Sequence, residues 1–225
     1  MVDTRRKRYE KSLEVFGKKS DWPAGQFMIA ICLTQLDRYV EAQRFYALAI
    51  RGFLKDRRQW YGTNQPDWLV DAYNLANHLE LCSQVEAEIE AFKHKNPQTR
   101  EAPVTLYADA VICLTSRRDE EASQCVPMLV KKPQIKWAFA VGETIRAIIQ
   151  FDQAAFDSAL GYLLEVHRGA AKFGGLRETP EGYLCLPAMS LSKIALECGL
   201  KVNVASEYLS KGYLDHLLRA GSSSS

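Results

Sequence analysis

The sequence predicts an all-α protein of stacked antiparallel helical hairpins, with about ten or eleven helices. Apolar residues recur at the period of an amphipathic helix in almost every segment of the 225-residue chain. No hairpin dipeptide lies between two alternating apolar runs, so nothing in the sequence favours strands. A closely spaced pair of short amphipathic helices near the N-terminus adds the repeat-like feature.

Three helices are expected in the first part of the chain. The first covers 4–17, and the second begins near Pro23, a residue favoured in the first turn of a helix, after a cap at Ser20 or Asp21. The third runs to about Leu54.

The second and third of these helices resemble one tetratricopeptide unit. Asp37 stands where that motif usually has glycine, and weaker echoes follow around Ala122 and Ala155. The chain therefore reads as one repeat-like hairpin followed by degenerate ones, a fold whose concave face usually binds a protein or peptide. The residues with tetratricopeptide spacing are Ile29, Ala30, Leu33, Tyr39, Ala42, Tyr46 and Ala49.

The middle of the chain contains four more expected helices. One starts around Pro66, and Ser83 with Glu86 has the spacing of a capping box that would begin the next. Another covers 104–114, and the helix after it must kink or end at Pro127.

The last third begins with two helices and a long irregular stretch. The first helix covers 135–150, and Asp152 can cap the second, which is expected to end near His167. The segment 168–183 contains several glycines and a proline, so it is expected to be a loop.

Two final helices complete a single domain over residues 1–220. The helix at 184–198 should be closed by Gly199 in the favoured position after its end, and the other covers 205–218. The serine-rich tail, 221–225, is expected to be flexible.

Composition and charge are those of an ordinary soluble protein. Apolar residues make up 47% and charged residues 25%, and the net charge of +2 indicates neither nucleic acid nor a membrane surface as a partner. The charged N-terminus has no apolar stretch behind it, so a cytoplasmic location is expected. The six cysteines lack metal-ligand spacing and are expected to be buried free thiols that act as small apolar fillers.

No catalytic constellation is found in the sequence. The four histidines lie on separate segments, without a cysteine or histidine at metal-ligand spacing. The glycine-rich "FGGLRETPEG" lacks the lysine-serine ending of a phosphate loop. A non-enzyme with no cofactor and no metal is therefore predicted.

Two segments are candidates for contact with a partner protein. The long loop between the third and fourth helices carries Arg57, Arg58, Trp60 and Tyr61, residue types that anchor protein interfaces. The same aromatic side chains could instead pack onto the core and hold the loop down. The irregular stretch before the last two helices offers the same alternatives with Lys172, Phe173 and Arg177.

The last third also resembles the immunity protein 49 family of bacterial polymorphic toxin systems. The match spans roughly 140–209 and comprises a capped helix that ends in His-Arg, a loop that closes with Pro-x-Gly, an apolar helix that ends in glycine, and a terminal Ser-x-Tyr-Leu. Its residues are Asp152, Ala155, Phe156, Ala159, Leu160, His167, Arg168, Pro180, Gly182, Gly199, Ser206, Tyr208 and Leu209.

This resemblance implies an all-helical cytoplasmic protein that binds and neutralises a cognate toxin domain without catalysis. Two alternatives remain open on the sequence. One is a tetratricopeptide-like adaptor or regulator that binds a protein or peptide partner, and the other is an enzyme whose site the sequence does not reveal.

Overall fold

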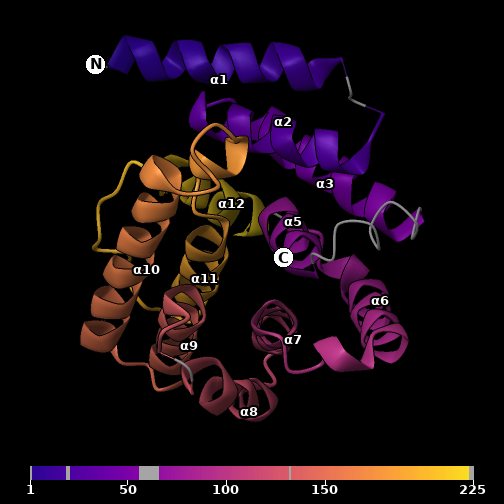
Figure 1. Ribbon diagram of the computed structural model, residues 1–225, viewed down its shortest axis with the longest axis vertical. Coiled ribbons are helices and arrows are strands. Elements are labelled where there is room, and N and C mark those ends of the chain that lie inside the picture. Colours follow the sequence, from indigo (N-terminus) through magenta and orange to yellow (C-terminus); the bar gives the residue numbers. More distant parts are fainter. Residues whose placement is uncertain (1, 19–20, 56–65, 132, 223–225) are drawn as a thin grey trace.

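The computed structural model describes residues 2–18, 21–55, 66–131 and 133–222 (Figure 1). Within these ranges the chain forms eleven α-helices and three short 3₁₀ helices, and no strand. The all-α prediction is therefore confirmed.

Eight of the α-helices form four consecutive hairpins, which follow one another around the molecule in Figure 1. In the last three of these hairpins the first helix lies on the inner side and the second on the outer side. The pairs are α2 (Pro23–Gln35) with α3 (Tyr39–Lys55), α5 (Pro66–Ala76) with α6 (Cys82–Lys95), α7 (Pro103–Thr115) with α8 (Asp119–Val130), and α9 (Lys136–Ile149) with α10 (Gln153–Phe173). The 3₁₀ helices η1 (Leu79–Leu81) and η2 (Pro97–Thr99) lie immediately before and after α6.

The turns inside the hairpins show that the repeat extends through the chain. Each turn has one left-handed residue that is not glycine, and these residues recur at almost equal intervals, at Asp37, Asn77, Arg117 and Phe151. Three of the turns also share a hydrogen bond from the following N–H to a carbonyl five residues back, with N–O distances of 2.8–3.0 Å. The echoes around Ala122 and Ala155 thus belong to real units, and the unit around Asn77 had no visible sequence motif.

The inner side of these hairpins is occupied by α11 (Leu186–Glu197), which packs against α5, α7 and α9 (Figure 1). Nine of its residues are buried. The Ser190 hydroxyl donates to Asp71 Oδ1 at 2.6 Å, and Asn74 donates to the Ser190 carbonyl at 2.9 Å. Lys193, 1% exposed, donates to Asn74 at 3.2 Å and pairs with Glu197 at 2.7 Å. The surface on which a tetratricopeptide protein usually binds its peptide is therefore filled by this chain.

The two terminal helices cover the hairpin α2–α3. The first, α1 (Val2–Gly17), lies on α2, whose residues are buried on all sides. The last, α12 (Lys211–Ser222), places Tyr213 against Tyr46 and donates from the Tyr213 hydroxyl to the Leu75 carbonyl at 2.7 Å. These helices shield apolar surface that the hairpins alone would expose.

Several local predictions are confirmed. The Asp152 side chain accepts from the Ala155 N–H at 3.0 Å and caps α10. Pro23 begins α2, and Gly199 follows α11 with a φ of 94°, a left-handed value that favours glycine. Buried cysteines include Cys32, Cys113 and Cys185, as expected of apolar fillers, whereas Cys82 is only half-buried.

Other boundaries differ from the predictions. α10 runs through 168–173 to Phe173, because Ala170 and Ala171 favour a helix and Gly169 is tolerated inside it. The last helix begins at Lys211 rather than near 205 and ends at Ser222, two residues into the expected tail. The residues before it form neither helix nor strand and include a turn at 207–208, and a hydrogen bond from Asn203 to Asp157 at 2.8 Å holds them to α10.

Two predicted end signals also fail. α6 begins at Cys82 with no side-chain cap, because Glu86 pairs with Arg118 rather than turning back to Ser83. α2 likewise has Trp22 at its N-cap position and no side-chain hydrogen bond there. For α8 the sequence allowed either a kink or an end at Pro127, and the helix does not end there but continues to Val130, since a proline in the last turn removes only a hydrogen bond close to the helix end.

Candidate functional site

The structure describes only part of the predicted interface. Arg57, Arg58, Trp60 and Tyr61 lie outside the described residues. Lys172 and Phe173 form the end of α10 instead of a loop, and Arg177 follows in the turns before η3 (Pro180–Gly182).

A groove of about 680 Å³ lies between α1 and the segment that joins α10 to α11, and we call it the α1 groove. One complete face of α1 forms its first wall, because the lining residues of this helix are spaced by three or four positions. The lining residues are Arg8, Lys11, Ser12, Val15 and Phe16 on α1, and Ala171, Lys172, Arg177, Glu178 and Tyr183 on the opposite wall.

Tyr183 holds the two walls together. Its ring lies 4.8 Å from that of Tyr9, centroid to centroid, and its hydroxyl forms a 3.2 Å hydrogen bond with the Ser12 hydroxyl. Its carbonyl accepts from the Gln35 side chain on α2. Residues far apart in the sequence thereby fix the position of α1 against the end of α10.

The α1 groove is positively charged. Arg8 and Lys11 lie on one wall, Lys172 and Arg177 on the other, and Glu178 is the single acid among the lining residues. In the part of the chain that the structure describes, none of these four basic side chains makes a hydrogen bond or an ion pair. Four such cations around one groove produce a local positive field although the net charge of the chain is only +2.

An apolar depression of about 350 Å³ adjoins the groove, and we call it the Trp22 depression. It shares Phe16 and Glu178 with the α1 groove, and Met28 and Pro180 are among its other lining residues. Trp22 is 60% exposed there, and Val15 in the adjoining α1 groove is 49% exposed. Exposed aromatic side chains next to basic ones are typical of protein-binding surfaces.

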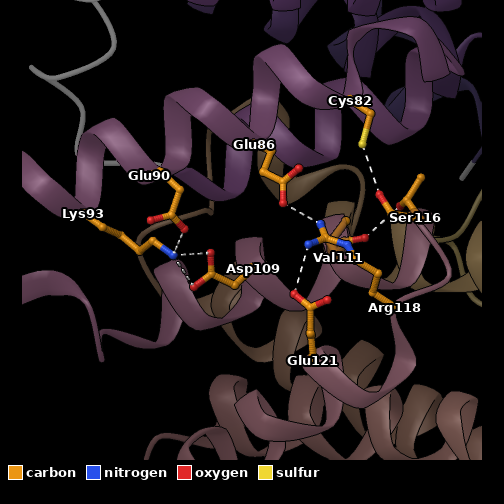
Figure 2. Close-up of polar contacts among 10 residues, drawn as sticks. Cys82, Glu86, Glu90, Lys93, Asp109, Val111, Ser116, Arg118 and Glu121 are labelled. Atoms are coloured by element: carbon orange, nitrogen blue, oxygen red, sulfur yellow. Dashed lines mark hydrogen bonds and ion pairs between the residues drawn. The ribbon is translucent and has the colours of Figure 1, made fainter.

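A second groove, of about 550 Å³, lies among α6, α7 and α8, and most of its charged side chains are joined in ion pairs (Figure 2). Figure 2 shows Arg118 bonded to Glu86 at 2.6 Å and to Glu121 at 3.0 Å. Lys93 pairs with Asp109 at 3.0 Å. The Arg118–Glu86 and Lys93–Asp109 pairs join neighbouring helices and hold the walls of this groove together. Its third cation, Arg100, donates only to the Lys93 carbonyl at 3.5 Å.

Two further polar side chains are buried away from both grooves. Burial raises the pKa of Asp71 to about 7, although hydrogen bonds from Ser190 and Tyr107 favour its charged form. Burial likewise lowers the pKa of His167 to about 4. Neither residue lines a groove described above, and the described residues contain no group of three metal-binding side chains.

Of the predicted site residues, the structure brings Lys172 and Arg177 together in the α1 groove. Phe173 is 88% exposed but does not line the groove. The sequence-based prediction missed the α1 wall and Trp22, because basic residues in a helix are also typical of a face that is simply exposed to solvent. The spacing of Arg8, Lys11 and Val15 predicts that these residues share one face of a helix. It does not predict which segment lies opposite that face.

Comparisons with known proteins leave the family open: no protein family, curated protein or solved structure matches this chain. Among the described residues, no helix combines the length and apolar character needed to cross a bilayer.

Proposed function

We propose that this protein is a non-catalytic immunity protein that binds and neutralises a cognate bacterial toxin domain in the cytoplasm. The observation that carries the proposal is the surface formed by the α1 groove and the Trp22 depression. It combines a depression with an exposed tryptophan and an adjoining groove whose four basic side chains have no partner among the described residues. Aromatic and arginine side chains contribute most of the binding energy in typical protein interfaces.

The resemblance to immunity protein 49 supplies the class of partner. Two of the residues that carry it, Pro180 and Gly182, form η3 beside the groove, whereas Asp152 caps the opposite end of α10. His167, near the end of α10, is buried with its ring 5.0 Å from that of Tyr208. These packing residues therefore position Lys172 and Arg177.

The adaptor alternative has less support from the geometry. The repeated hairpins favour a binding protein, but α11 covers the inner faces of α5, α7 and α9. A peptide could enter there only after α11 left, which would expose buried Asp71 and Asn74 without their partners.

The test is co-expression with the toxin encoded beside the gene in the native host. Wild-type protein should restore growth, co-purify with the toxin at equal stoichiometry, and protect only when it is present in at least equal amount. Trp22→Ala should fold normally and weaken binding by about 2 kcal/mol, because an anchor side chain is lost. Protection by trace amounts would indicate catalysis, and the absence of any complex would refute the proposal.

Phe151→Ala is the matched control for Trp22→Ala. Phe151 is equally exposed, at 60%, but lies beside the N-terminal end of α10. The helix rises by about 30 Å over its length, so this residue is far from the groove. Its variant should bind the toxin as the wild type does.

A further inference from the structure

We infer that the α1 groove binds an acidic protein segment whose apolar side chain enters the Trp22 depression. The inference rests on the proposed function and specifies the chemistry of the toxin surface. A segment in the groove would meet Arg8 and Lys11 on one side and Lys172 and Arg177 on the other. Opposed cations of this kind match a run of aspartate or glutamate.

The charge arrangement of the α1 groove differs from that of the α6–α8 groove. There Lys93 and Arg118 pair with carboxylates at 2.6–3.0 Å and Arg100 donates only to a carbonyl at 3.5 Å, whereas the four cations of the α1 groove make no ion pair among the described residues and face one acid among ten lining residues. An acidic segment bound here therefore displaces water from the basic groups without breaking an ion pair among the described residues.

The apolar part of the surface indicates a protein segment rather than a nucleic acid. Val15 and Phe16 continue the basic stripe of α1 toward Trp22, Met28 and Pro180. The stripe from Arg8 to Phe16 rises by about 12 Å, the length of a few extended residues or about two helical turns. A phosphate backbone has no apolar group to bury at the end of this stripe, whereas an acidic segment with one leucine or phenylalanine does.

The direct test uses three fluorescein-labelled probes of about 15 units: a peptide of glutamates with interspersed leucines, its glutamine counterpart, and an oligothymidine. Fluorescence anisotropy should show binding of the glutamate peptide, weakened by raising the salt from about 50 mM to about 200 mM. The glutamine peptide should bind at least about tenfold more weakly, because it lacks the charges that the groove attracts.

Two charge-reversal variants locate the binding. Lys11→Glu with Lys172→Glu changes both walls of the groove and should weaken peptide binding by about tenfold or more. Lys131→Glu with Lys136→Glu makes the same change in net charge at exposed positions near α8 and α9, and should leave binding unchanged. Circular dichroism and thermal melting of both variants check that they fold.

The outcomes separate this inference from the proposed function. Equal loss in both double variants, no binding of the glutamate peptide, or tighter binding of oligothymidine would each overturn the inference. Toxin neutralisation that survives Lys11→Glu with Lys172→Glu would also overturn it while leaving the immunity function intact. Selective peptide binding without any toxin complex would support the acidic ligand and refute the toxin as its source.

Discussion

At the residue scale, the hairpin turns depend on backbone conformations that few side chains favour. Asp37 and Asn77 have φ values of 60° and 59°, and aspartate and asparagine tolerate this left-handed region better than most residues. Asp37 thus takes the left-handed conformation at the position where a tetratricopeptide turn usually has glycine. Arg117 and Phe151 take the same conformation with side chains that offer no such advantage.

The buried carboxyl group of Asp71 should make stability depend on pH. Its pKa is raised to about 7 from the usual 3.8, so between these values the folded protein keeps a proton that the unfolded chain releases. The free energy of unfolding contributed by this group therefore falls as pH rises from about 4 to about 7 and is constant above that. Asp71→Asn removes this titrating group. As pH rises from about 4 to about 7, the free energy of unfolding of the variant should therefore increase relative to that of the wild type, by about 4 kcal/mol at most.

Urea denaturation of both proteins at several pH values measures this difference. His167 acts in the opposite direction, because its lowered pKa of about 4 makes stability rise with pH between about 4 and about 6.5. It is present in both proteins, so its effect cancels in the comparison. A stability difference that stays constant with pH would mean that Asp71 is ionised in the folded protein.

At the scale of the element, α1 acts as a cover for α2 rather than as part of the core. None of its described side chains is fully buried, whereas Cys32 beneath it on α2 is 0% exposed. Tyr9 lies close enough for the Cys32 thiol to influence its pKa, and Leu13 packs against the core. Cys32 is therefore a reporter of α1 docking.

Leu13→Asp should release α1 and expose Cys32 to a thiol reagent under native conditions, because a carboxylate cannot be buried there without a partner. Val15→Asp, at a position on the same helix that is 49% exposed, adds the same charge and should leave Cys32 protected. Mass spectrometry of the modified cysteines measures both. Simultaneous modification of Cys185, which is buried at the N-cap of α11, would instead indicate global unfolding and contradict independent release of α1.

At the scale of the whole molecule, α11 joins hairpins that an ordinary repeat protein would leave coupled only to their neighbours. It contacts α5, α7 and α9 together, and hydrogen bonds connect it to Asp71 and Asn74. The chain should therefore unfold in one cooperative transition, as a single domain does.

Leu191→Ala tests this coupling. Leu191 is 0% exposed on α11, so its truncation should cost about 2–5 kcal/mol. Scanning calorimetry should show that the entire transition moves to lower temperature, with the calorimetric and van't Hoff enthalpies still equal. Two separated transitions in either protein would show that the hairpins unfold independently.

Much of the fold is determined by the sequence alone. Helical period, the proline at the start of α2, the aspartate cap of α10 and the glycine after α11 act over a few neighbouring residues, and all four are found where the sequence predicts them. The hairpin α2–α3 belongs with them, because its two apolar faces are joined by a short turn.

Tertiary structure determines the features that depend on contacts between segments distant in the sequence. The irregular course of the chain before α12 depends on contacts with α10 such as Asn203 with Asp157. The filling of the inner face depends on Ser190 meeting Asp71, more than a hundred residues away in the chain. The α1 groove likewise brings Lys11 opposite Lys172, although only one of its walls has a readable helical spacing. Helix-forming interactions act between neighbouring residues, whereas a site between distant segments exists only after the core has fixed their relative positions.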